Sequence, residues 1–169
     1  MKKLTLSLAV LGLISSTALS QSKTSTNKNS EKMTIDNQAE VPVKAFFDAF
    51  GKGDFEGILD TFHPDVTITA VRESPNEPPG IYGTYHGMDG VKSFLSKLGD
   101  AFDTQSFTVD DIVGNAEVAY ASGHFLHKVK STDKMFESDW ALHTVVKDGK
   151  IYEYHFYEDS ASFEEANVR

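Results

Sequence analysis

The second half of the sequence constrains the fold most, because it is organised as strands joined by short turns. The strands are predicted near residues 104–113, 116–130, 135–147 and 150–158. Asp148-Gly149, between the last two, is a strong signal for a two-residue hairpin turn, since both residue types tolerate the positive φ that such a turn needs. Consecutive strands joined by short turns pair antiparallel, so this half of the chain predicts a β-meander.

Three helices are predicted before the meander. Apolar residues recur at helical spacing after Pro42, which suits the first turn of a helix, and after Asp54 and Asp89, which are good N-caps. Two short strands are expected between the second and third helices, at 66–71 and 82–86. Because the helices come mainly first and the sheet last, the sequence predicts an α+β domain, which we expect over residues 41–165.

The first 40 residues are expected to lie outside this domain. Residues 1–20 combine a basic start, an apolar run and a small, polar end, which is the pattern of a signal peptide cleaved before Gln21. An uncleaved anchor or a buried N-terminal helix are the alternatives. Residues 21–40 are mostly polar and predict a flexible linker. The sequence therefore predicts an exported protein, periplasmic or secreted, with no membrane attachment after cleavage.

The charge and the cysteine count narrow the possible functions. The formal net charge is −9, and an acidic surface repels phosphate backbones, so no nucleic-acid partner is expected. The sequence contains no cysteine, which excludes disulfides, thiol nucleophiles and thiolate metal sites.

Three parts of the sequence occur in an order and at a spacing that is typical of one family. They are Val43–Phe47 followed by Phe62–Val66, then Tyr85–Val91, and finally Trp140 with Asp148–Ile151, Tyr157 and Asp159. Together they resemble SnoaL-like proteins of the nuclear transport factor 2-like superfamily, over about 41–163. The resemblance implies a cone-shaped barrel, in which a strongly curved, mixed or antiparallel sheet wraps around three helices and one pocket. Members include ketosteroid isomerases, polyketide cyclases and epoxide hydrolases, so the fold alone does not assign the chemistry.

The hairpin turns allow the strands of the meander to be registered. A two-residue loop at 148–149 places Asp139 opposite Glu158, and a four-residue loop at 131–134 places Ser122 opposite His143. One face of the sheet then carries Tyr120, Ser122, His124, Leu126, Asp139, Ala141, His143, Tyr154, Phe156 and Glu158. The other carries Ala119, Ala121, Gly123, Phe125, Trp140, Leu142, Thr144, His155 and Tyr157. Both faces are half apolar, so periodicity alone does not decide which one is concave.

The resemblance implies that the first face lines the pocket. The oxyanion acid of ketosteroid isomerases aligns with Ala141, and a pocket aromatic aligns near Glu158. The second face, around Trp140, would then be the outer surface, and we expect a homodimer through it, since exposed apolar patches mark interfaces and relatives often dimerise there. A β-bulge within 116–130 would invert part of this assignment.

The resemblance also suggests candidate catalytic residues. Ketosteroid isomerase chemistry is not expected, because its tyrosine, base and acidic donor align with Phe46, Ala70 and Ala141. In the polyketide-cyclase branch, a pocket histidine and an acid on the last strand act together. His143 would be the base and Glu158 or Asp139 the acid, since one carboxyl of a buried pair keeps its proton well above the usual pKa. The side chains expected to bind the substrate are Tyr120, Ser122, His124, Tyr154, Phe156 and Phe46.

Less specific explanations stay open for the same residues. Asp139 and Glu158 could both lie in water at the rim, and His143 and His124 could simply line the cavity. His127 and His155 are expected at the outer surface of the sheet. No family pattern supports a metal site, and no cofactor is expected. Two functions remain: isomerase- or cyclase-type chemistry on a small apolar ring compound, or a non-catalytic ligand-binding or dimeric assembly module.

Overall fold

The computed structural model describes residues 37–75 and 80–168 of the chain. Its elements are helices α2 (Glu40–Lys52) and α3 (Phe55–Asp60), strands β1 (Phe62–Ala70) and β2 (Gly83–His86), helix α4 (Gly87–Ala101), strands β3 (Phe102–Gly114), β4 (Val118–Val129), β5 (Met135–Lys147) and β6 (Lys150–Glu158), and helix α5 (Ser160–Asn167). The predicted signal peptide, 1–20, and most of the predicted linker lie outside the described residues, so both stay predictions. Within the described ranges, no helix is long and apolar enough to cross a membrane.

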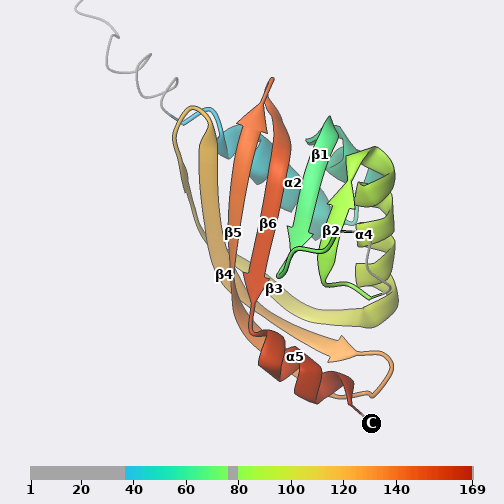
Figure 1. Ribbon diagram of the computed structural model, residues 1–169. Coiled ribbons are helices and arrows are strands. Elements are labelled where there is room, and N and C mark those ends of the chain that lie inside the picture. The colour runs from blue at the N-terminus through green and yellow to red at the C-terminus, as the bar shows by residue number, and fades with distance from the viewer. Residues whose placement is uncertain (1–36, 76–79, 169) are drawn as a thin grey trace, which may run out of the picture.

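The six described strands form one mixed sheet in the order β2-β1-β6-β5-β4-β3. Neighbouring strands run antiparallel except β1 and β6, which run parallel and pair Ala70 with Phe156. The sheet is strongly curved, and the start of β3 sweeps below β1 and β2 (Figure 1). It is not closed into a barrel, because β2 and β3 are edge strands. The predicted α+β class and the predicted curved sheet are confirmed.

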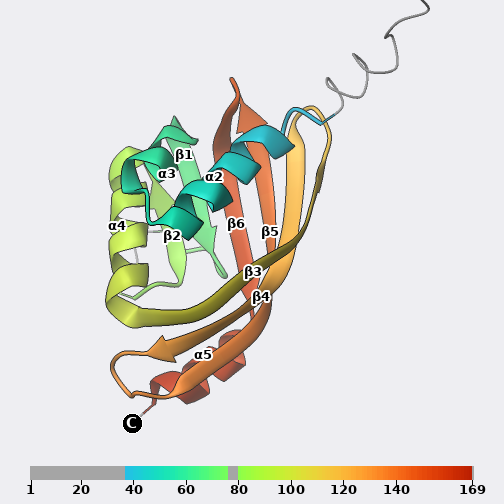
Figure 2. The same cartoon turned by 180° about the vertical axis from the view of Figure 1, so that it is seen from behind.

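The three helices predicted in the first half of the chain are also present. Helices α2 and α3 lie in front of the curved sheet, and α4 lies beside β1 and β2 (Figure 2). Phe46 of α2 packs edge-on against Phe62 and Tyr154, with ring centroids 5.6 Å apart in both pairs. Gly53, at φ 65°, ends α2 by donating its N–H to two carbonyls of the last turn. Asp54 then begins α3 by accepting an N–H of the first turn.

Helix α5 is present in the structure but is not predicted from the sequence. Asp159 caps its start by accepting two N–H groups of the first turn. Phe163 contributes its large apolar side chain, and this ring packs against Tyr82, Phe102 and Phe136 with centroids 5.1, 5.4 and 5.3 Å away. One such residue gives no helical periodicity to detect, so tertiary contacts determine where α5 lies.

The β5–β6 hairpin starts in the predicted register and leaves it at a β-bulge. Asp148 and Gly149 form the turn, with φ of 53° and 73°, and the two pairs next to the turn are the predicted ones. Val145 then pairs with Glu153, which leaves Tyr152 as an extra residue in β6. The bulge therefore lies in β6, outside the segment 116–130 where the sequence raised the possibility of one.

The predicted pairs beyond this bulge are wrong. Glu158 lies opposite Trp140 rather than Asp139, and His143 lies opposite His155. The reason is that side chains alternate along a strand, so one extra residue moves all later residues to the other face relative to their neighbours.

The β4–β5 hairpin is displaced by two residues from the predicted register. Its loop takes in residues 130–134, and Asp133 adopts φ 60°. Tyr120 consequently lies opposite His143, and His124 lies opposite Asp139. A displacement by two leaves the same residues on the same face, so these four side chains still share one surface.

That shared surface is the outer face of β4 and β5, and the prediction that it is concave is wrong. Trp140 is 3% exposed and belongs to the core, together with Phe125 and Leu142. Gly123 lies opposite Trp140 and makes room for it, since a Cβ there would come within 2.6 Å of the indole. The expected homodimer therefore cannot use the surface around Trp140. The physical reason is that the concave face takes the larger apolar side chains, whose burial stabilises the fold most.

Candidate active site

A cavity of about 280 Å³ lies between the helices and the concave face of the sheet. Its wall is mostly aromatic and includes Phe46, Phe47, Phe50, Phe55, Phe94, Phe102, Phe107, Phe125, Tyr154 and Phe156. The lining side chains that carry polar groups are Tyr82, Thr104, His127, Tyr154 and Glu158. Apolar pockets with a few convergent polar groups are typical binding or active sites.

Glu158, the last residue of β6, is the carboxyl in this wall. Its side chain is partly buried, and its Oε1 accepts a hydrogen bond of 2.5 Å from the hydroxyl of Tyr82. Burial raises the pKa of Glu158 to about 7, an effect that the Tyr82 hydrogen bond opposes and the nearby Asp159 carboxylate reinforces. Near neutral pH the carboxyl is thus present in both protonation states, as a general acid–base group requires.

Tyr82 directly precedes β2 and donates its hydroxyl hydrogen bond to the Glu158 carboxylate. Burial, followed by the charge of Glu158, raises the pKa of its phenol far above the usual range, so it acts as a hydrogen-bond donor. The ring lies 5.1 Å from Phe163 of α5, and the guanidinium of Arg72 lies 5.5 Å from its centroid. These contacts on the ring fix the orientation of the hydroxyl towards Glu158.

His127 of β4 is a second buried titratable group in the wall. It is 8% exposed and lies between Phe125 and Phe102, with ring centroids 4.2 and 4.8 Å away. Burial lowers the pKa of the imidazole to about 4, so it is neutral at physiological pH. Its Nδ1 has no hydrogen-bond partner among the described residues. The prediction that His127 lies at the outer surface is wrong, because the face of β4 that carries His127 is the one that lines the cavity.

Four of the predicted site residues line the cavity: Phe46, Tyr154, Phe156 and Glu158. Their roles in binding or catalysis stay predictions. Burial, followed by the charge of Glu158, raises the pKa of the Tyr154 phenol, which keeps it protonated. The structure therefore brings a carboxyl and two phenols, those of Tyr82 and Tyr154, to the same aromatic pocket.

The other five predicted site residues lie on the outer face of the sheet, away from the cavity. They are Tyr120, Ser122, His124, Asp139 and His143. Tyr120 is 54% exposed, and its ring lies 5.1 Å from that of His143. The predicted combination of His143 with Glu158 is consequently not formed.

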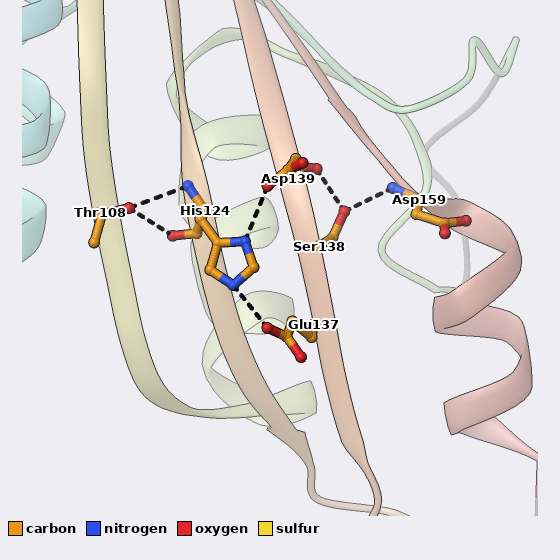
Figure 3. A network of polar contacts seen from close by, with 6 residues as sticks. All are labelled: Thr108, His124, Glu137, Ser138, Asp139 and Asp159. Carbon is orange, nitrogen blue, oxygen red and sulfur yellow. Dashed lines mark hydrogen bonds and ion pairs between the residues drawn. The ribbon is translucent and has the colours of Figure 1, made fainter.

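His124 has its own polar contacts on this outer face (Figure 3). Its Nδ1 lies 3.0 Å from Asp139 Oδ1, and its Nε2 lies 3.1 Å from Glu137 Oε1. The hydrogen bond to Asp139, more than the Glu137 carboxylate, raises the pKa of His124. Across the described part of the chain, no three His, Asp or Glu side chains are grouped so that they could hold a metal ion.

The positions that align with ketosteroid isomerase residues also fall on two faces. Phe46 and Ala70 line the cavity with apolar side chains. Ala141, which aligns with the acidic donor of that family, is exposed on the outer face. The carboxyl that does line this cavity is Glu158, at a different position in the sheet.

Comparison with known proteins gives consistent results over most of the chain. A family model described as a SnoaL-like domain matches residues 43–154. The structure of an NTF2-like protein from Burkholderia xenovorans LB400 is 28% identical, with a TM-score of 0.67 over 79% of this chain and 99% of that one. No curated protein matches the sequence.

Two further structures resemble the chain in fold alone, because their identities are low. A protein from Jannaschia sp. CCS1, named for SnoaL-like polyketide cyclases, is 16% identical with a TM-score of 0.64, over 80% of this chain and 95% of that one. TerC, crystallised with polyporic acid, is 20% identical with a TM-score of 0.64, over 77% and 98%. The family match ends before Glu158, so membership by itself does not assign a role to this carboxyl. From the matched residues and the shared fold, the chain belongs to the SnoaL-like domain family of the NTF2-like superfamily.

Proposed function

We propose that this domain catalyses isomerase- or cyclase-type acid–base chemistry on a small, mostly apolar ring compound. The observation that carries the proposal is the Glu158 carboxyl, which lies in the wall of an aromatic cavity with a pKa of about 7. General bases are most effective when their pKa lies near the working pH. Relatives in fold that are named as polyketide cyclases and isomerases support the same class of reaction.

The proposed step is a proton transfer at carbon. The ionised Glu158 removes a proton from a carbon next to a carbonyl group, which leaves an enolate, and the protonated Glu158 returns the proton to the same or another carbon. Tyr82 is a positioning residue, because its hydroxyl bonds to Oε1 and leaves Oε2 for the proton. The aromatic wall excludes water and binds the ring, and a cavity of about 280 Å³ suits a compound of one to three rings.

Hydrogen exchange tests this step without knowledge of the natural substrate. The protein would be incubated in D2O with cyclic ketones such as 2-tetralone, and deuterium uptake next to the carbonyl would be followed by NMR. We expect uptake above the buffer rate, rising with pH to a plateau above about 7, and falling roughly 100-fold or more in Glu158→Gln. Glu153→Gln, at an exposed carboxyl of the same strand, is the matched control. Equal rates in both variants would contradict the proposal.

Export is the second part of the proposed function and rests on residues 1–20. A basic start followed by a short apolar run directs secretion, and the acidic domain would then work in the periplasm or outside the cell. The test is the intact mass of the full-length chain after expression in a bacterial host. We expect a product that begins at Gln21. A product that keeps residues 1–20 would contradict export by cleavage.

The alternative, a dimeric assembly module, is favoured by one feature of the outer face. Tyr120, His143 and His155 lie side by side across β4, β5 and β6, and Tyr157 stacks on His155 at 4.0 Å. This row is partly exposed and aromatic, which suits contact with the same face of a second copy. Light scattering should then give the mass of a dimer, and Tyr120→Glu should reduce it to that of a monomer. A wild-type protein that is monomeric at high concentration would exclude this role.

A further inference from the structure

We infer that His127 and Thr104 form a polar anchor at the end of the cavity away from Glu158, which binds an uncharged hydroxyl or carbonyl group of the ligand. This inference deepens the proposed function and rests on it for the reacting end of the ligand. It describes the ligand as a ring compound with two polar ends, one at Glu158 and the other at His127.

The first support is an imidazole in an otherwise apolar part of the wall. His127 is 8% exposed and lines the cavity. Its Nδ1 is enclosed by the surrounding side chains and has no hydrogen-bond partner among the described residues, so a ligand would reach the imidazole at Nε2. A histidine in such a wall requires an explanation, because burying a polar ring without partners is unfavourable. The flanking rings of Phe125 and Phe102 would accommodate an aromatic side chain at this position equally well, so packing alone does not explain a histidine.

The second support is the position of Thr104. Thr104 of β3 is the direct cross-strand partner of His127, and both side chains line the cavity. Residues that face each other across two strands have Cβ atoms about 5 Å apart, so one small ligand group can reach both. The neutral imidazole offers one donor and one acceptor, and the threonine hydroxyl offers both, which complements a hydroxyl or a carbonyl group.

The third support is the separation of the two polar ends. His127 lies opposite Phe136, and Glu158 lies opposite Trp140, so the two groups are four residues apart along β5. That spacing is about 13 Å along the strand, and the two strands β4 and β6 are roughly 10 Å apart across β5. Since both side chains point into the cavity from a curved sheet, a ligand of two or three fused rings could contact both ends.

The charge of the anchor specifies the ligand further. Burial keeps the imidazole neutral at physiological pH, and its ring neighbours Phe102, Phe107 and Phe125 carry no charge. A carboxylate or phosphate placed here would lose its hydration without gaining a cationic partner. An uncharged hydroxyl or carbonyl is therefore the group that fits.

The test is a comparison of two ligands that differ only at the distal end. Calorimetry would measure the binding of 2-tetralone and 6-hydroxy-2-tetralone to wild-type protein and to His127→Phe, which retains the stacking between the neighbouring rings. We expect the hydroxyl to strengthen binding by roughly 3- to 10-fold in the wild type and by less than 2-fold in the variant. Circular dichroism and thermal unfolding of His127→Phe would confirm that it is folded. Thr104→Val, at an exposed position, should reduce the same ratio without a folding defect.

The inference is overturned if the ratio is the same in wild type and His127→Phe, or if neither ketone binds to the wild type. Glu158→Gln separates this inference from the proposed catalysis. A variant that stops deuterium uptake but keeps the hydroxyl preference supports both ideas. If deuterium uptake depends on Glu158 but the hydroxyl does not strengthen binding, the proposed catalysis stands and the anchor is excluded. If the hydroxyl strengthens binding through His127 but uptake does not depend on Glu158, only the anchor stands.

Discussion

Replacement of the Glu158 carboxyl by an amide should change how the stability of the domain depends on pH. The ordinary pKa of this carboxyl is 4.5, and burial raises it to about 7 in the folded domain. Below pH 4.5 the carboxyl is protonated in both the folded and the unfolded state, so its ionisation does not change the free energy of unfolding. Between pH 4.5 and 7 the unfolded state releases the proton while the folded state keeps it, so stability falls as the pH rises. Above pH 7 the loss is complete.

The size of the loss follows from the same two values. At 1.36 kcal/mol for each pH unit, the interval from 4.5 to about 7 corresponds to roughly 3 kcal/mol. Glu158→Gln removes this ionisation and keeps an oxygen that can accept the Tyr82 hydroxyl. Relative to the wild type, the variant should therefore gain roughly 3 kcal/mol in free energy of unfolding between pH 4.5 and pH 8.

Urea denaturation at several pH values between 4.5 and 8 measures this difference. Dilute protein is needed because the sequence pI is about 5.0. Glu153→Gln on the same strand is the control, and its difference from wild type should not vary by this amount. The reasoning is refuted if the difference between Glu158→Gln and wild type is constant with pH, since the carboxyl would then be solvated. A difference of the opposite sign would mean that the folded domain stabilises the carboxylate.

Three other predictions concern single side chains. Tyr82→Phe removes a hydrogen bond that lowers the pKa of Glu158, so the carboxyl should titrate above 7 by NMR, whereas Tyr152→Phe should leave it unchanged; a lower midpoint would contradict the assigned contact. Gly123→Ala would place a Cβ 2.0 Å from the Thr108 carbonyl and should cost about 1–3 kcal/mol in urea denaturation. Gly51→Ala in α2 meets nothing within 4 Å and should raise the free energy of unfolding by up to about 1 kcal/mol. If Gly123→Ala and Gly51→Ala lowered the free energy of unfolding by similar amounts, the packing argument would be refuted. Asp139→Asn should lower the pKa of His124 in an NMR titration while the distant Asp133→Asn does not, and an unchanged midpoint would mean that the Asp139 contact is absent in solution.

Most of the fold could be predicted because its signals are local. Asp54 and Gly53 mark the helix boundaries, and Asp148-Gly149 marks the last hairpin, through the backbone conformations that these residues favour. Helix α5 could not be predicted in this way, because Phe163 packs against residues that are distant in the sequence, such as Tyr82 and Phe102.

The candidate site was predicted only in part because it depends on register. The sequence correctly places Tyr154, Phe156 and Glu158 on the concave face of β6, but it assigns the wrong face to β5 and β4. The cause is a single extra residue, Tyr152, whose unpaired position leaves no distinct pattern in the sequence. One available signal was Gly123, because a residue without a side chain beside a large one such as Trp140 indicates close packing in the core. Phe125 and His127 follow at alternate positions of the same strand, so they would face the core as well.

The position of β6 between β1 and β5 also determines when the domain can fold. Of the described strands, β6 is synthesised last, and it joins the two halves of the sheet. Until residues 150–158 are available, β1 and β2 therefore pair with no described strand other than each other. Contacts such as Ala70 with Phe156 close a long loop, and such contacts form slowly. The cavity, whose carboxyl comes from the last residue of β6, is therefore completed only after residues 150–158 have been made. A chain interrupted before Lys150 should remain open and susceptible to proteolysis.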